Sequence, residues 1–278
     1  MTNWLVNGEL DGRPSPADRG LAYGDGLFET IALRAGRLRF LDYHFDRLLA
    51  GCERLGIPAP DTEQLTQELQ RAGRGCREGT ARIVITRGTG NRGYQPPAAV
   101  QPTRVVGVTP ADDEPGPAWR DGIRIRFCAM PLSENVVLAG MKTLNRLEQV
   151  MARNEWHTPE IAEGLMLTES GQVVCGTMSN LFLVSDGALL TPSVSRCGVR
   201  GVMRRIILEE ARQLGIAVHK PVITPATLSA ATELFVSNSL RGIGPVTGWH
   251  DEHRAVGEVT RTLMAALVQR GVHECAAG

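Results

Sequence analysis

Lys142 lies at the centre of residues 140–150, which read GMKTLNRLEQV. The chain has 30 lysine and arginine residues together, yet lysine occurs only here and at Lys220. Arginine keeps its proton in proteins, whereas a desolvated lysine can lose its proton and attack a carbonyl carbon as a neutral amine. Lys142 is therefore a candidate nucleophile, and the alternative is that two lysines have survived by chance.

The residues on either side of Lys142 predict a strand, a loop and a helix. Residues 122–128 alternate between apolar and polar side chains, as a half-buried strand does. Residues 144–156 repeat apolar side chains at helical spacing, which places Lys142 at a loop-to-helix junction. Beyond this helix the patterns predict strands at 163–168, 172–175, 180–184 and 233–237, and helices at 203–214 and 256–270.

The N-terminal part of the chain carries a similar mixture of elements. The patterns predict strands at 27–34, 81–87 and 104–109, and helices at 41–55 and 61–72. The acidic, proline-containing residues 111–117 show no periodicity and favour a linker. We therefore expect an α+β protein with a small N-terminal α/β domain (1–112), a linker (113–121) and a larger C-terminal α/β domain (122–278) that carries Lys142.

Two glycine-containing segments are candidates for phosphate binding. Residues 88–93, GTGNRG, match Gly-x-Gly-x-x-Gly, but they lead from a strand into Tyr94 and two prolines. A dinucleotide site needs a helix at that point, so we reject it. Residues 197–204 lead into a helix at Gly201, where unpaired N–H groups and the helix dipole favour an anion. The alternative there is an ordinary left-handed turn.

Composition excludes several classes of partner. The 278 residues include 30 acidic and 30 basic side chains, so no net field attracts nucleic acid or an anionic membrane. The N-terminus lacks the pattern of a signal peptide, and no apolar run approaches the about 20 residues of a membrane span. We expect a cytoplasmic protein. The six cysteines form no Cys-x-x-Cys pair and the histidines are dispersed, so we expect reduced thiols and no metal site.

A set of motifs resembles one family of enzymes. In chain order these are Asp18-Arg19-Gly20, Gly24–Thr30, Arg47, Met141-Lys142, Ser179–Phe182 and Gly201–Arg204. Their order and spacing over nearly the whole chain resemble the fold-type IV pyridoxal 5'-phosphate enzymes, which include branched-chain aminotransferases, D-amino-acid aminotransferases and aminodeoxychorismate lyases. Within that family, residues 142–150 and the run from Arg87 to Tyr94 are most similar to the lyases.

The resemblance implies a two-domain fold with a cofactor cleft between the domains, and a homodimer. It also implies that Lys142 forms a Schiff base with pyridoxal 5'-phosphate. The cofactor phosphate is then held by Arg47, by the turn Gly201-Val202-Met203 and by the hydroxyl of Ser239. A guanidinium fork and backbone N–H groups suit a dianionic phosphate. For the substrate carboxylates the expected residues are Arg92 and Tyr94, and the alternative is that Arg92 is an ordinary surface arginine.

The implied reaction releases pyruvate and 4-aminobenzoate, a folate precursor, from 4-amino-4-deoxychorismate. In this hypothesis Lys142 removes the proton from the carbon that bears nitrogen. The same ammonium then protonates the departing enolpyruvyl group.

The chain departs from the family pattern at Cys175, where most members carry a glutamate that faces the pyridine nitrogen of the cofactor. A carboxylate keeps that ring protonated and therefore a strong electron sink. A neutral thiol does not, and burial opposes thiolate formation. The nearest acid, Glu169, falls in the preceding turn. Three interpretations remain: a lyase driven by aromatisation, a D-amino-acid or branched-chain aminotransferase-like enzyme, and a catalytically weakened protein that still binds the cofactor.

Overall fold

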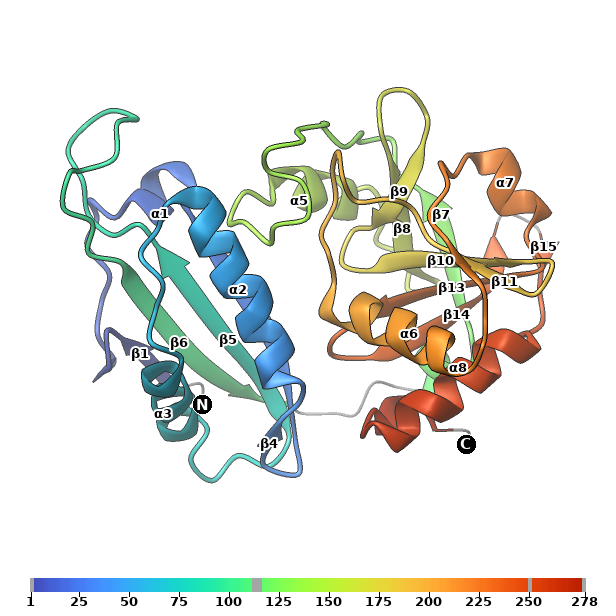
Figure 1. Cartoon of the computed structure of the whole chain (residues 1–278), viewed down its shortest axis with the longest axis horizontal. Coiled ribbons are helices and arrows are strands. Elements are labelled where there is room, and N and C mark those ends of the chain that lie inside the picture. Colours follow the sequence, from blue (N-terminus) through green and yellow to red (C-terminus); the bar gives the residue numbers. More distant parts are fainter. Residues whose placement is uncertain (1–2, 112–116, 250–251, 277–278) are drawn as a thin grey trace. The chain divides into compact units, whose positions relative to one another are not determined.

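The computed structural model describes residues 3–111, 117–249 and 252–276. The chain divides into two compact units (Figure 1). The first unit contains Met1–Asp112 and Met141–Asn145, and the second contains Asp113–Gly140 and Arg146–Gly278. Each unit is built around one β-sheet with helices, in agreement with the expected α+β class. Of the expected linker, residues 113–116 lie outside the described residues, and the rest forms the short helix α4 (Pro117–Asp121).

The first unit contains a six-stranded antiparallel sheet with the strand order β2-β1-β6-β5-β3-β4. Its strands are β1 (Asn3–Val6), β2 (Glu9–Leu10), β3 (Gly26–Arg34), β4 (Arg37–Leu38), β5 (Gly79–Thr86) and β6 (Thr103–Pro110). The central strands β3, β5 and β6 pair along their full length. Because β4 covers only the C-terminal end of β3, the N-terminal end of β3 remains at the edge of these six strands.

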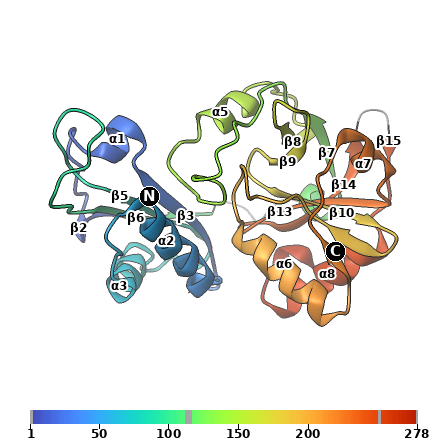
Figure 2. The same cartoon turned by 45° about the horizontal axis from the view of Figure 1, so that its top comes forward.

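The helices of the first unit are α1 (Arg19–Tyr23), α2 (Leu41–Leu55) and α3 (Thr62–Ala72). Helices α2 and α3 cover one face of the sheet (Figures 1 and 2). The alternate residues of β3 that face them, such as Leu27 and Ile31, are buried in a core with Leu48 of α2 and Leu65 of α3. The side chain of Asp61 accepts the N–H groups that open α3.

The second unit contains a nine-stranded sheet. Its strands are β7 (Ile123–Phe127), β8 (Ile161–Leu167), β9 (Val173–Gly176), β10 (Asn180–Ser185), β11 (Ala188–Leu190), β12 (Val218–His219), β13 (Glu233–Asn238), β14 (Gly242–Trp249) and β15 (Glu252–His253). The order is β12-β11-β10-β13-β14-β7-β8-β9, and β15 pairs with β14. Since β9 also pairs with β10, the strands β10, β13, β14, β7, β8 and β9 form a closed ring.

The helices of the second unit lie on different parts of this ring. They are α4, α5 (Leu147–Arg153), α6 (Val202–Gln213), α7 (Pro225–Ala230), α8 (Glu258–Gln269) and a final 3₁₀ turn (His273–Cys275). Helices α6 and α8 pack on β13 (Figure 1). The paired residues Phe182 and Phe235 stack with their ring centroids 4.8 Å apart. Their neighbours Leu181 and Val236 point to the opposite face and pack in a core with Trp119 of α4.

None of the helices in the described part of the chain is both long and apolar enough to cross a membrane.

Candidate active site

Lys142 is held at the free edge of strand β3. Residues 142–144 run antiparallel to it, since the N–H of Phe28 donates to the carbonyl of Lys142 and the N–H of Leu144 donates to the carbonyl of Gly26, both at 3.0 Å. The Nζ atom of Lys142 lies 4.3 Å from the centroid of the Phe28 ring. The backbone position of the lysine is therefore fixed by a sheet, and its amine lies against an aromatic face.

This placement differs from the expectation that Lys142 belongs to the larger C-terminal domain. The segment Met141–Asn145 packs with the first unit, and the Nδ2 atom of Asn145 donates to the carbonyl of Gly24 at 3.1 Å. The preceding residue, Gly140, instead forms a bridge with Val199 of the second unit. The physical reason is strand pairing over a long sequence separation, which local periodicity does not report.

A buried carboxylate on β3 fixes the predicted phosphate ligand Arg47. Glu29 accepts from Nε of Arg47 at 2.8 Å, from Nη2 of Arg47 at 2.5 Å and from Nδ1 of His44 at 2.5 Å. Glu29 and His44 are almost completely buried. The Nε2 atom of His44 has no hydrogen-bond partner among the described residues. The motifs assigned a role to Arg47 and none to Glu29, which lies within residues 24–30, or to His44, which lies one helical turn before Arg47 on α2.

The electrostatics of this cluster favour a charged Glu29 and a neutral His44. Burial alone would raise the pKa of the Glu29 carboxyl, but the charge of Arg47 and the hydrogen bonds from His44 and Arg47 outweigh it, so the pKa lies below its ordinary value. Burial lowers the pKa of His44, and the charges of Arg47 and Lys142 lower it further. His44 therefore donates from Nδ1 and leaves an unprotonated Nε2.

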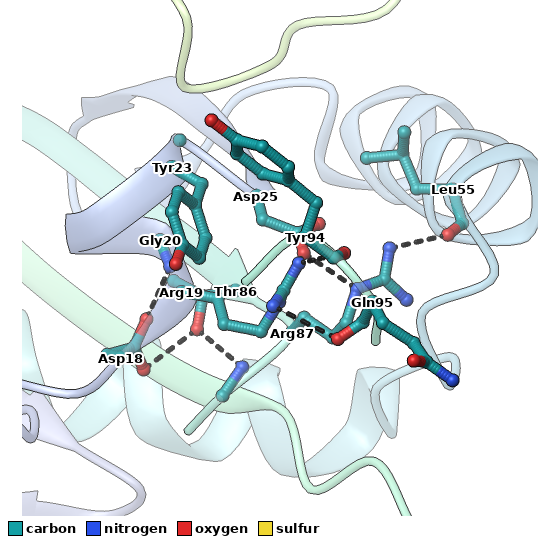
Figure 3. Close-up of polar contacts among 12 residues, drawn as sticks. Asp18, Arg19, Gly20, Tyr23, Asp25, Leu55, Thr86, Arg87, Tyr94 and Gln95 are labelled. Carbon is teal, nitrogen blue, oxygen red and sulfur yellow. Dashed lines mark hydrogen bonds and ion pairs between the residues drawn. The ribbon is translucent and has the colours of Figure 1, made fainter. Parts of the chain in front are cut away.

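The glycine-rich loop between β5 and β6 is held by Arg19, which shares an acid with Arg87 (Figure 3). Arg19 donates from Nη1 to the carbonyl of Gly93 at 3.0 Å and from Nη2 to the carbonyl of Tyr94 at 2.9 Å. Its Nε and the Nε of Arg87 both donate to the same Oδ2 of Asp25 at 2.8 Å. Burial raises the pKa of Asp25, but these hydrogen bonds and charges outweigh it and lower the value. The loop backbone is thus anchored by an ionic cluster.

The predicted substrate ligands Arg92 and Tyr94 lie on the exposed side of this loop. Tyr94 is 85% exposed, and its ring centroid lies 5.4 Å from that of Tyr23. The hydroxyl of Tyr23 accepts from the N–H of Gly93 at 3.2 Å. No helix follows the loop, since the next element is β6, which agrees with the rejection of a dinucleotide site.

The N-terminus of α6 has the features of an anion site. Gly201 is its N-cap residue and has no side chain that could cap the first turn, which also contains no acid. Asn180 donates from Nδ2 to the carbonyl of Val199 at 2.9 Å. A Cβ atom on Gly201 would lie 2.0 Å from Oδ1 of Asn180, so only glycine fits there. The N–H groups of Val202 and Met203 therefore remain available to an anion such as a phosphate.

Three polar side chains lie in a row on the sheet face that meets this helix end. Asn180 is paired with Cys175 on β9 and with Ser237 on β13. Directly paired residues point to the same face and lie on strands about 4.8 Å apart. Ser237 is only 1% exposed, and its Oγ has no hydrogen-bond partner within the described chain. Ser239, the predicted hydroxyl donor, lies just after β13 and is half-buried.

Cys175 is a neutral thiol in this row. Burial, with the neighbouring Cys197 and Glu163, raises its pKa to about 12, and Arg146 offsets only part of that rise. At neutral pH the thiol therefore stays protonated and carries no charge.

Glu163 is a second buried carboxylate that the motif analysis missed. Its oxygens accept from the backbone N–H of Thr177 at 3.0 Å, from the Thr177 hydroxyl at 2.6 Å and from the Ser179 hydroxyl at 2.7 Å. It thereby holds the turn between Cys175 and Asn180 in place. The available signal was an acid at the start of the predicted apolar strand of residues 163–168, and this acid lies within the observed strand β8. The alternative acid, Glu169, is exposed in a turn.

The predicted residues fall into two groups. Lys142 and Arg47 belong to the first unit with the loop of Arg92 and Tyr94, and the second unit contains Cys175, Ser239 and the helix start at Gly201-Val202-Met203. This donor set fits a phosphate-bearing aldehyde cofactor, because a guanidinium, an uncapped helix start and a lysine amine are all present. Within the described ranges, no cluster of three His, Cys, Asp or Glu side chains could hold a metal ion.

The aminotransferase class IV family model matches residues 26–249, a range that includes every element described above except β1, β2, α1, β15, α8 and the final 3₁₀ turn. The chain belongs to the aminotransferase class IV family. In this family the fold is that of the fold-type IV enzymes, as the motifs predicted.

Individual relatives divide between lyases and aminotransferases. The chain is 34% identical over 269 residues to an aminodeoxychorismate lyase of Vibrio harveyi, covering 94% of this chain and 98% of the relative. The crystal structure of 4-amino-4-deoxychorismate lyase from Pseudomonas aeruginosa is similar with a TM-score of 0.90 and 46% identity, over 96% of this class IV chain and 98% of the other. A D-alanine aminotransferase of Staphylococcus epidermidis is 27% identical over 274 residues, or 95% of each chain.

Proposed function

We propose that this class IV enzyme is a pyridoxal 5'-phosphate-dependent 4-amino-4-deoxychorismate lyase that releases pyruvate and 4-aminobenzoate. The observation that carries the proposal is Lys142, which is fixed at the edge of β3 with its amine against Phe28. The similarity to lyases of Vibrio harveyi and Pseudomonas aeruginosa over nearly the whole chain supports this activity.

The proposed cofactor ligands come from both groups of residues. Lys142 binds the cofactor covalently, Arg47 and the N–H groups of Val202 and Met203 hold its phosphate, and the hydroxyl of Ser239 adds a donor. Cys175 would face its pyridine nitrogen, as the resemblance of the motifs implies. When bound, the cofactor withdraws electrons from the substrate carbon that bears nitrogen.

The chemical steps assigned to the protein are proton transfers by Lys142. Its neutral amine removes the proton from the substrate carbon that bears nitrogen, and the resulting ammonium delivers a proton to the enolpyruvyl group as the carbon–oxygen bond breaks. Pyruvate leaves, and the ring becomes aromatic. The Phe28 face stabilises the ammonium form, and the ordered backbone of residues 142–144 keeps the amine in place between the two transfers.

The neutral thiol of Cys175 favours the lyase over an aminotransferase. An aminotransferase must stabilise a carbanion long enough to reprotonate a different carbon, and a protonated pyridine ring supports this. A thiol whose pKa is raised to about 12 cannot supply the negative charge that keeps the ring protonated. Elimination needs less of this stabilisation, because aromatisation of the product drives it.

The activity is tested with two substrate mixtures. The protein is incubated with pyridoxal 5'-phosphate and 4-amino-4-deoxychorismate, and separately with D-alanine or a branched-chain amino acid plus a keto acid. Pyruvate and 4-aminobenzoate from the first mixture support the lyase. Keto-acid exchange in the second mixture, without product in the first, would establish an aminotransferase instead, and bound cofactor without either product would establish a weakened enzyme.

Lys142 is tested by the substitution Lys142→Arg. Arginine keeps the positive charge but forms no Schiff base and does not give up a proton at neutral pH, so we expect loss of both the visible absorbance of the bound cofactor and turnover. Lys220→Arg is the matched control, because it changes the other lysine, and it should retain both properties. Full activity of Lys142→Arg would contradict the assignment.

We further propose that Arg92 and Tyr94 contact substrate, that the enzyme acts in the cytoplasm, and that it forms a homodimer. The loop that carries Arg92 and Tyr94 is anchored by Arg19, which supports a binding role for its exposed side chains. For the dimer the support is the exposed apolar face of α5, with Leu147 72% exposed and Val150 and Met151 also exposed. Such faces are typical of protein interfaces.

A further inference from the structure

Two cationic side chains share one aromatic ring in the first unit. The Nζ atom of Lys142 lies 4.3 Å from the centroid of the Phe28 ring, and the Cζ atom of Arg82 lies 4.7 Å from the same centroid. Phe28 is buried, whereas Arg82 is exposed. The Nζ atom of Lys142 and the Cζ atom of Arg82 are therefore no farther apart than the sum of these two distances.

The strand register explains why these three side chains meet. Phe28 on β3 pairs with Val84 on β5, so Arg82, two residues away, points to the same face as Phe28. Thr143 is bridged to Leu27, which places the preceding Lys142 beside Phe28.

This shared face lies away from helices α2 and α3 of the first unit. Leu27 points into the core with α2 and α3, and its neighbour Phe28 therefore points the other way. Phe28, Arg82 and Lys142 thus form a patch on the face opposite α2 and α3, which we call the Phe28 patch. Glu29 is directed to the opposite face, where Arg47 and His44 engage it.

The Phe28 patch is positively charged, and no carboxylate within it pairs with Arg82. Arg82 forms no ion pair or hydrogen bond with any other residue that the structure describes, so its guanidinium donors remain available to a ligand. The ring holds the guanidinium plane through the cation–π contact, which limits its freedom before a ligand arrives. A guanidinium that has no carboxylate partner among the described residues, next to a second cation, favours an anion that both can reach.

We propose that Arg82 binds a carboxylate of the substrate while Lys142 removes the proton from the substrate carbon that bears the amino group. This inference rests on the proposed function, because it takes Lys142 as the reacting lysine. A planar guanidinium meets a carboxylate with two parallel hydrogen bonds. The ligand is therefore a primary amine that also carries a carboxylate, and a rigid framework about the size of one ring joins the two groups. Arg82 thus selects for the acid group at a defined separation from the amine.

The substrate offers two carboxylates, and the products separate them. The ring carboxylate remains in 4-aminobenzoate, and the enolpyruvyl carboxylate remains in pyruvate. Affinity for each product, measured alone with the cofactor-loaded protein by isothermal titration calorimetry, therefore reports which carboxylate Arg82 meets.

The test compares Arg82→Gln and Arg82→Lys with Arg74→Gln. Arg74 is an exposed arginine of the same unit, outside the Phe28 patch, and its substitution removes the same charge. We expect Arg82→Gln to raise the Kd of one product by about 10- to 100-fold, the range for hydrogen bonds to charged groups. Arg82→Lys should lie between, because lysine keeps the charge and loses the fork. Arg74→Gln should bind both products as the unchanged protein does.

The visible absorbance of the bound cofactor is recorded for each variant. It should be unchanged in Arg82→Gln, which shows that the variant is folded and that Lys142 is still joined to the cofactor. Unchanged Kd values for both products in that variant would overturn the role of Arg82. If the unsubstituted protein itself lacks the absorbance band and lyase turnover, the proposed function fails instead, so the two failures are distinguishable.

Discussion

At the scale of single residues, Glu29 determines how Arg47 can meet an anion. Its carboxylate accepts two N–H groups from one edge of the Arg47 guanidinium and a third from His44. The guanidinium is thereby held in one orientation rather than sampling several, which reduces the entropy lost on binding a phosphate. Replacing Arg47 by lysine would lose this arrangement, since an ammonium has no planar edge.

The substitution Glu29→Gln should destabilise the protein and weaken cofactor binding. It removes the buried carboxylate that pairs with the half-buried Arg47 guanidinium, and breaking such a pair typically costs about 3 kcal/mol of unfolding free energy. It also frees the guanidinium to rotate, so we expect the Kd for pyridoxal 5'-phosphate to rise at least about tenfold. Urea unfolding and a cofactor titration measure the two effects. Glu9→Gln, at an exposed carboxylate with the same charge change, should alter neither.

The same cluster predicts lower stability in acid. The pKa of His44 is lower in the folded chain than its ordinary 6.5, so below that pH the unfolded chain binds more protons than the folded one. The pKa of Glu29 is also lower than its ordinary 4.5, so its contribution is complete above that pH and is lost as pH falls through the folded pKa. The unfolding free energy should therefore fall from about pH 6.5 downward, and Glu29→Gln should remove the lower part of that dependence. A flat profile of the unsubstituted protein between pH 7 and pH 4 would contradict these directions.

At the scale of elements, the start of α6 depends on two neighbouring strands. Asn180 on β10 holds the carbonyl of Val199 and packs against Gly201, and the buried carboxylate of Glu163 on β8 holds the turn that leads to Asn180. The N–H groups at the start of α6 are therefore positioned by side chains from β10 and β8. The backbone of Gly201 is extended and unstrained, so glycine is needed there for space rather than for conformation.

The substitution Gly201→Ala should therefore act through a steric clash. The added Cβ would lie 2.0 Å from Oδ1 of Asn180, which forces a shift at the helix start and costs about 1–3 kcal/mol. Because the shift moves the N–H groups of Val202 and Met203, cofactor affinity should fall at least about tenfold. Fluorescence titration with pyridoxal 5'-phosphate measures this.

Gly171→Ala is the matched control for this clash. Its backbone has a positive φ of 81°, but nothing lies near the added atom. We expect a similar small loss of stability from backbone strain and no loss of affinity. Equal cofactor affinities in the two variants would contradict the steric explanation for Gly201.

At the scale of the whole molecule, local patterns predicted most elements and fewer of their contacts. The strands β5 and β6 and the helices α2, α3, α6 and α8 lie close to their predicted bounds, because each has a clear apolar period. β14 was missed, since its glycines and proline are unusual in strands, and it is kept as a strand by pairing with β13 and β7.

The candidate site shows the same limit. Motifs identified Lys142, Arg47 and Gly201, whereas Glu29 lies inside a motif that assigned it no role, and Glu163 and Arg82 lie outside the motifs. Their roles arise from pairing between distant segments, and the packing that buries two of them is absent from local sequence. The placement of residues 141–145 in the first unit could not be predicted for the same reason.

The exposed apolar face of α5 predicts that two copies of the chain associate through it. We expect light scattering after size-exclusion chromatography to give twice the mass of one chain, because burial of Leu147, Val150 and Met151 in a second copy removes apolar surface from water. Val150→Glu should shift the mass towards that of one chain, whereas Gln67→Glu, which adds the same charge to exposed residues of α3, should not. A single-chain mass for the unsubstituted protein at micromolar concentration would contradict the homodimer.

The pairing of residues 142–144 with β3 also bears on how this chain can be divided. A fragment that ends at residue 112 would contain all six strands of the first sheet, yet it would lack the segment that occupies the free end of β3 and the buried Met141 side chain of its core. Its open strand edge would be a template for association with other copies. The N-terminal part therefore needs a short segment from later in the sequence, and without that segment its folding is compromised. During synthesis, the chain must extend past residue 145 before the first unit can be complete.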